Sequence, residues 1–186
     1  MDTTSALNDS SRYSRLQLRM LVILRMLIGW HFLYEGVVKL WNPNWSASGY
    51  LMDSQGWFAG IFHSMAGTPW LLNIVDFVNV WGLIIIGLSL ILGLFARYAA
   101  LGGIVLLAMY YLSHPAIIGA KYALPSEGSY LFVNKNLIEM FALGVLYAFP
   151  TSIYVGLERL LALRRGESVP SAEPVAAKMT EKETVA

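Results

Sequence analysis

Four ionisable residues lie within an apolar stretch that is long enough to cross a lipid bilayer. Residues 20–41 read MLVILRMLIGWHFLYEGVVKLW and contain Arg25, His31, Glu35 and Lys39. Because about 20 helical residues span a hydrocarbon core of about 30 Å, this stretch is predicted to be a membrane-spanning helix. His31, Glu35 and Lys39 are spaced four residues apart and therefore lie along one side of that helix. A charged group that faces lipid is costly, so this side is expected to face other helices, where it can exchange protons or bind a polar ligand.

The composition of the chain indicates an integral membrane protein. Hydrophobic residues make up 56% of the 186 residues and charged residues only 13%. The formal net charge of +1 does not suggest nucleic acid as a partner. The absence of cysteine excludes a disulfide, a thiolate nucleophile and a cysteine-ligated metal. Neither a metal nor a haem is expected at the three histidines, since His31 and His114 are predicted at different depths.

Three further apolar stretches follow, so the fold class is predicted to be all-α, an integral membrane four-helix bundle. The later spans are expected at about residues 73–95, 99–118 and 136–155. The link of residues 96–98 is so short that the second and third spans should form an antiparallel hairpin. Residues 42–72 are rich in aromatic side chains, and a short amphipathic helix there is expected to lie in the membrane interface.

These elements divide the chain into three parts. Residues 1–19 form a polar leader, residues 20–158 the membrane domain, and residues 159–186 a tail whose composition predicts disorder. Arginines precede the first span, lie in the link after the second and follow the fourth, which places them all on one side of the membrane. The positive-inside rule therefore predicts a multi-pass protein of the bacterial or archaeal inner (plasma) membrane, with both termini cytoplasmic.

With this topology, polar residues of all four spans collect in one layer near the outer surface. The catalytic candidates, expected to handle protons, are Glu35, Glu139 and His114; the substrate-binding candidates are Lys39, Lys135, Asn79 and Asn136; and the candidates for a quinone pocket are Trp41, Tyr110 and Tyr111. A quinone needs a proton donor or acceptor at each carbonyl and an apolar, aromatic slot, and this layer contains both. The alternative is that these groups are interhelical ion pairs or snorkelling side chains that only stabilise the bundle.

Two expectations concern individual contacts in this bundle. Glu35 and Glu139 are expected to interact across the first and fourth spans, directly or through Lys39, water or a quinone oxygen. Arg25 lies deeper, in the cytoplasmic half, where no acidic residue of the other spans falls. Its expected partners are backbone carbonyls, the link near Arg97 or lipid phosphate.

The first two spans also resemble a known family of small four-helix membrane proteins. The motif residues are Arg25, Gly29, Phe32, Gly36 and Lys39 in the first span, and Gly93, Leu94 and Arg97 after the second. This pattern is similar to the DoxX/DoxD family over roughly residues 20–158. The DoxD-like branch implies the large membrane subunit of a thiosulfate:quinone oxidoreductase, a thiosulfate dehydrogenase with quinone as substrate or bound cofactor.

The resemblance also bears on partners. Because the chain has no apparent two-electron relay of its own, a small single-span subunit is an expected partner. The other expected partners are membrane lipid and, in a homo-oligomer, further copies of the chain. The other function left open is a non-catalytic membrane scaffold, or a small-solute or lipid-handling protein of the DoxX type.

Overall fold

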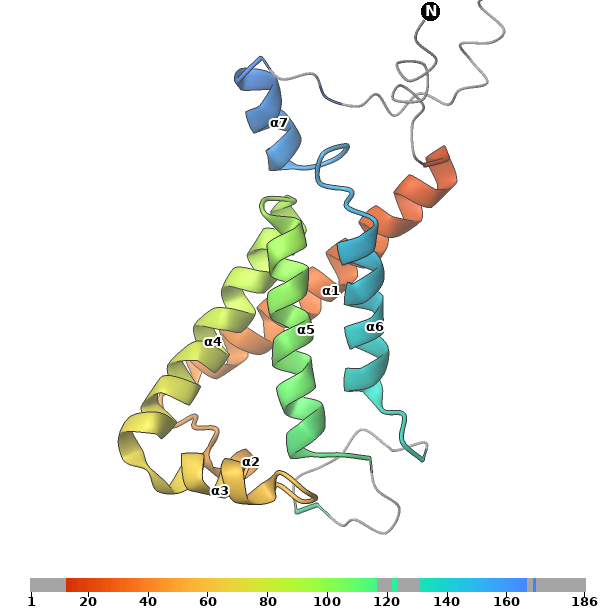
Figure 1. Cartoon of the computed structure of the whole chain (residues 1–186). Coiled ribbons are helices and arrows are strands. Elements are labelled where there is room, and N and C mark those ends of the chain that lie inside the picture. The colour runs from red at the N-terminus through yellow and green to blue at the C-terminus, as the bar shows by residue number, and fades with distance from the viewer. Residues whose placement is uncertain (1–12, 117–121, 124–130, 167–168, 170–186) are drawn as a thin grey trace, which may run out of the picture.

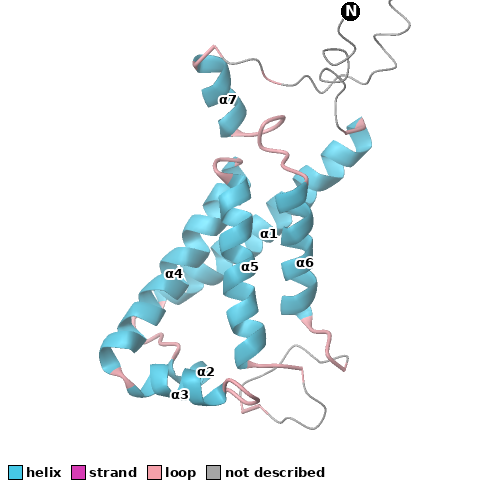
Figure 2. Cartoon of the chain, viewed as in Figure 1, coloured by secondary structure: helices cyan, strands magenta, loops and turns pink. Residues whose placement is uncertain are grey.

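The computed structural model describes residues 13–116, 122–123, 131–166 and 169, and in these residues the regular elements are all helices (Figure 2). The helices are α1 (Arg15–Trp41), α2 (Ser48–Met52), α3 (Ala59–Gly67), α4 (Pro69–Leu92), α5 (Ala96–Ser113), α6 (Lys135–Ala148) and α7 (Leu157–Arg164). The prediction of an all-helical chain is thus confirmed for the part that the structure describes.

Helices α4, α5 and α6 run side by side, and α1 crosses behind them, packing mainly against α4 and also contacting α6 (Figure 1). The short helices α2 and α3 lie at one end of the molecule, where α1 ends and α4 begins (Figure 1). We call this the α2–α3 end. The opposite end, where α1 begins and α4 turns into α5, lies next to α7 and is called the α7 end (Figure 1).

Three of the described helices are long and apolar enough to cross a membrane. These are α1, α4 and α5, with 27, 24 and 18 residues. Helix α6 has 14 residues, or about 21 Å at 1.5 Å per residue, which is shorter than the hydrocarbon core. The predicted extent of the fourth span, residues 136–155, is therefore wrong, because Pro150 keeps Phe149 out of the helical conformation and α6 ends there. A bundle of four spans remains a prediction.

Small residues let α1 and α4 approach closely. A Cβ atom at Gly87 of α4 would lie 2.5 Å from the backbone nitrogen of Leu33 and 2.7 Å from the carbonyl oxygen of Gly29. A Cβ atom at Gly36 would lie 2.7 Å from a side-chain carbon of Ile84. Glycines at such contacts bring backbones together and increase van der Waals packing between membrane helices. They hold α1 firmly against α4, and with it the polar side chains that α1 carries.

The turn between α4 and α5 lies slightly earlier than the sequence predicted. Gly93 ends α4 with φ of 62°, in the left-handed region that glycine adopts at little cost. Phe95 follows with φ of 52°, and α5 already begins at Ala96. The expected link of residues 96–98 is therefore wrong by a few residues, whereas the two helices do lie side by side as a hairpin (Figure 1).

Two helices cross the predicted domain boundaries, although the division into domains stays a prediction. Helix α1 begins at Arg15, before residue 20, because Ser14 and Gln17 form a capping box that satisfies its first N–H groups. Of the predicted tail, residues 159–164 belong to α7, while residues 170–186 lie outside the described residues. The expected short helix in the aromatic segment is present as α3, and it is preceded by α2, which the sequence did not predict.

Candidate functional site

Polar residues of three helices and one loop meet around the ammonium group of Lys39, near the end of α1. The Lys39 Nζ lies 3.1 Å from Oδ1 of Asn79 on α4 and 3.7 Å from Oε2 of Glu35, one turn earlier on α1. It also lies 5.3 Å and 5.6 Å from the ring centroids of Trp45 and Tyr110, where an aromatic face attracts a cation. Since only 16% of the Lys39 side chain is exposed, these contacts replace most of its water. We call these five residues the lysine cluster.

Hydrogen bonds in the lysine cluster have a fixed direction. Lysine can only donate, so Asn79 must present its carbonyl oxygen to Lys39. The amide nitrogen of Asn79 then donates to the hydroxyl oxygen of Tyr110, at 2.7 Å. The Tyr110 oxygen is thus an acceptor in this bond, and among the described residues its own hydrogen has no acceptor. The cluster therefore offers an unused hydrogen-bond donor in addition to a positive charge.

A second polar group adjoins the lysine cluster at the α2–α3 end. Tyr50 on α2 donates its hydroxyl hydrogen to the backbone carbonyl of Tyr110 at 3.3 Å, and its ring stacks on His114 at a centroid distance of 3.9 Å. The Nε2 atom of His114 lies 3.6 Å from Oδ2 of Asp53, which is too long for a hydrogen bond. Burial raises the pKa of Tyr50 and lowers the pKa of His114, although Asp53 partly opposes the lowering. At neutral pH both side chains are therefore uncharged.

Glu139 forms a separate pair with a residue of α1. Its Oε1 lies 2.7 Å from Nδ1 of His31, and this contact joins α6 to α1. The second carboxylate oxygen, Oε2, is buried and has no hydrogen-bond partner in the described residues. The expected interaction of Glu139 with Glu35 is absent as a direct contact, since Glu35 pairs with Lys39 instead. The spacing of four places His31, Glu35 and Lys39 on one side of α1 but does not indicate which of them faces Glu139.

The other predicted site residues lie outside the lysine cluster. Lys135 and Asn136 are in the first turn of α6, which Asn134 caps. The Trp41 side chain is 84% exposed, and the hydroxyl of Tyr111 donates to the carbonyl of Phe132 at 2.7 Å. Of the three aromatic residues predicted for a quinone pocket, only Tyr110 belongs to the cluster. Trp45 supplies the other ring of the cluster, and the sequence could not place it because it lies in a loop.

Arg25 occupies a different place, toward the α7 end. Its side chain is buried with 3% exposed, and it donates to the Thr151 hydroxyl at 3.0 Å and to the Val155 carbonyl at 2.9 Å. The expected backbone carbonyl partner is thus confirmed, whereas the partner segment after α6 was not predicted. Arg25 therefore holds the chain between α6 and α7 against α1. Its Nε atom is buried without a partner in the described residues.

Of three comparisons with known proteins, one found a match. A scan against protein families matches DoxX over residues 20–115, from the first apolar stretch of α1 to the residues just after α5. The matched segment contains the whole lysine cluster and His114, while Glu139 on α6 lies beyond it. No curated protein and no solved structure matches the chain. Because the match covers more than half of the chain, the protein belongs to the DoxX family of membrane proteins.

Proposed function

We propose that the chain is the membrane subunit of a quinone-linked oxidoreductase and that a quinone carbonyl binds beside Lys39 and Tyr110. The observation that carries the proposal is the fixed direction of the bond from Asn79, which leaves the hydroxyl hydrogen of Tyr110 without an acceptor in the described residues. A quinone carbonyl is a hydrogen-bond acceptor, so it complements this donor. The rings of Trp45 and Tyr110 form an aromatic wall beside it, as quinone binding requires.

The charge of the cluster also suits the reduction of a quinone. Two electrons and two protons convert a quinone to a quinol, and negative charge develops on its oxygens before the protons arrive. The ammonium group of Lys39 stabilises such charge in a site with little water. Glu35, whose side chain is 46% exposed, connects Lys39 to solvent and is positioned to pass protons inward.

For the reductant we propose a small sulfur anion, with thiosulfate as the first compound to test. Two thiosulfate ions that join through a new S–S bond release two electrons, which balances the reduction of one quinone. The positive charge of Lys39 favours approach of such an anion. We propose that electrons pass either by direct contact of the two substrates or through a partner subunit.

We propose that the α7 end faces the cytoplasm, which puts the lysine cluster near the outer surface. The arginines of the α7 end are Arg15, Arg19, Arg97, Arg159, Arg164 and Arg165. An excess of arginine marks the cytoplasmic side of membrane proteins. Reporter fusions at Arg97 and Arg165 are therefore expected to read cytoplasmic and a fusion at Gly67 external; the opposite pattern would reverse the orientation.

A structural role is the second candidate, and a specific observation favours it. The His31–Glu139 and Lys39–Asn79 contacts each join two helices, as pairs that only stabilise a bundle do. In that case, the protein is a scaffold or handles a small solute or lipid without redox chemistry. The two functions differ in whether the free donor on Tyr110 has a ligand.

The test uses the full chain, purified in mild detergent. Bound quinone is extracted and measured by mass spectrometry, and thiosulfate-dependent reduction of a short-chain quinone is measured per molecule of protein. Tyr110→Phe, which removes only the hydroxyl, is expected to lower quinone retention by up to about tenfold. Tyr98→Phe is the matched control, because Tyr98 lies on the same helix with its side chain exposed. Equal quinone content in the two variants, or none in the unmodified chain, would favour the structural role.

A further inference from the structure

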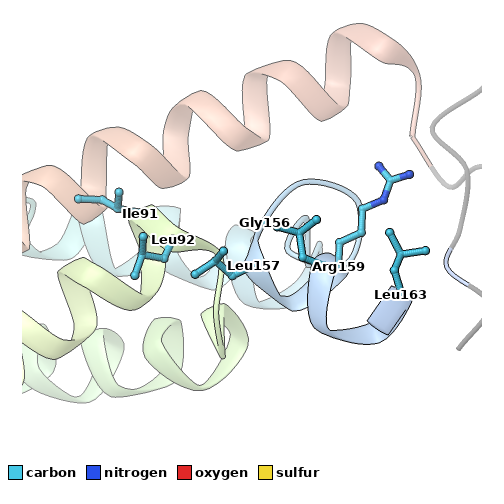
Figure 3. Close-up of a pocket in the computed structure, with 7 residues that line it drawn as sticks. Ile91, Leu92, Gly156, Leu157, Arg159 and Leu163 are labelled. Atoms are coloured by element: carbon cyan, nitrogen blue, oxygen red, sulfur yellow. The ribbon is translucent and has the colours of Figure 1, made fainter. Parts of the chain in front are cut away.

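A groove with apolar walls lies between the end of α4 and α7, far from the lysine cluster. It has a volume of about 590 Å³, which is within the range of small-molecule sites. Figure 3 shows Ile91 and Leu92 of α4 at one end of it and Arg159 and Leu163 of α7 at the other, with Leu157 between them. The groove is therefore apolar along its length and cationic at one end.

The guanidinium of Arg159 is only partly used by the protein. Its Nη1 donates to the Tyr154 carbonyl at 2.7 Å, and its other nitrogens have no acceptor among the described residues. This bond fixes the side chain and leaves a planar pair of donors for an oxyanion such as a phosphate. Arg164 and Arg165 are exposed in the next turn. Glu158 is the single acid in the described part of this end, and it interacts electrostatically with Arg25.

The apolar end of the groove adjoins exposed apolar side chains of α4. Helix α4 is a candidate membrane span, and Leu92, Leu88 and Ile85 on it are 45%, 41% and 60% exposed. The three leucines of α7 that line the groove are also exposed: Leu157, Leu160 and Leu163. An acyl chain can thus pass from the side of α4 into the groove without meeting water.

From this continuity and the charge at its end, we propose that the groove binds one anionic phospholipid, with an acyl chain along Ile91 and Leu92 and the phosphate on Arg159. Arginines next to a membrane span attract anionic lipid, and the groove adds a defined position to this general attraction. The bound lipid fastens α7 to the end of α4. This site is independent of the lysine cluster and of the quinone proposal.

The experiment uses the full chain in detergent, with phosphatidylglycerol and phosphatidylcholine of the same acyl chains as probes. Native mass spectrometry counts bound lipid, and a thermal melt measures the stabilisation that a ligand of the folded state produces. Phosphatidylglycerol is expected to stay bound and raise Tm, whereas phosphatidylcholine and inorganic phosphate are not. Arg159→Gln is expected to weaken phosphatidylglycerol binding by about tenfold or more, because it removes charge-assisted hydrogen bonds.

Two matched controls separate the groove from diffuse charge attraction. Arg97→Gln removes the same charge at the same end, but Arg97 lies over the ring of Tyr147 and outside the groove, so binding should be unchanged. If Arg159→Gln fails to fold, Leu163→Asp tests the groove wall, with the exposed Leu161 of the same helix changed to Asp as its control. The proposal would be overturned if both lipids bound equally well or if inorganic phosphate shifted Tm as much as phosphatidylglycerol does. It would also be overturned if Arg97→Gln lost as much lipid binding as Arg159→Gln, or if the two leucine variants lost lipid binding equally.

Discussion

Gly87→Ala is the substitution that most directly tests how α1 is held against α4. A Cβ atom at Gly87 would lie 2.5 Å from the Leu33 nitrogen, 2.7 Å from the Gly29 oxygen and 2.8 Å from the Leu33 Cα. All three atoms belong to the backbone, so no side chain can rotate away from the added methyl group. The two helices must move apart by about 1 Å to restore ordinary contact distances.

The size of the effect follows from this separation. A gap of 0.5–1 Å already removes about a quarter to a half of the dispersion energy between facing atoms, and overpacking of a tight site costs about 1–3 kcal/mol. The upper part of this range, about 3 kcal/mol, is expected because the clash involves backbone on both sides. The change would also move Lys39 relative to Asn79, since these residues lie on the same two helices.

The loss of stability is measured by unfolding the purified protein in detergent, either in thermal melts or by denaturant titration. Gly82→Ala is the matched control, because it makes the same change on the same helix and its Cβ atom would meet nothing within 4 Å. Its stability should be unchanged or higher by up to about 1 kcal/mol, as alanine favours a helix over glycine. If Gly87→Ala were as stable as Gly82→Ala, the close approach of α1 and α4 would not exist in the protein.

Three further predictions concern ionisable side chains. Arg25→Gln is expected to lower the free energy of unfolding by about 3 kcal/mol, because it removes two hydrogen bonds that a charged group donates. The variant should also accumulate less in membranes, and normal accumulation on quantitative blots would contradict this prediction. A double-mutant cycle of His31→Gln and Glu139→Gln should give a coupling energy of about 0.6–1.7 kcal/mol, whereas additive effects would mean that the two side chains do not pair. Burial lowers the pKa of His114 although Asp53 partly opposes the shift, so the imidazole binds a proton more readily in the unfolded chain than in the folded one. The stability of the folded protein should therefore be full above about pH 6.5 and fall as the pH drops below this value. Thermal melts at a series of pH values measure this loss, and His114→Gln should reduce it.

The helices could be predicted because hydrophobicity and length determine them locally. Helix α1, the hairpin of α4 and α5, and the short helix α3 follow from apolar runs and from the residues that interrupt them. The extent of α6 was overestimated, since apolar residues continue past Pro150 although the helical backbone does not. An apolar run indicates where a span is favourable, whereas the position of proline decides where the helix ends.

The candidate site could be predicted only in part, because residue spacing gives the side of a helix but not its neighbour. The collection of Lys39, Asn79 and Tyr110 near one end followed from depth along each helix. Which acid pairs with which base depends on how the helices are rotated and how far apart they lie, and sequence does not supply this. For that reason Glu139 was matched with Glu35, although it contacts His31. The contribution of Trp45 was missed because a loop, without periodicity, positions it.

The hydrogen bonds of Arg25 also have a consequence for how the protein is made. Thr151 and Val155 follow Arg25 by 126 and 130 residues, so the ribosome supplies them only after α1, α4 and α5 have been synthesised. Until then the guanidinium is a charge without its partners in an apolar segment, which favours delay of α1 near the membrane surface or at the insertion machinery. We therefore expect α1 to reach its final depth late, when the segment after α6 arrives. A chain that stops before this segment would keep an unpaired arginine, the kind of defect by which membrane quality control can recognise an unfinished protein.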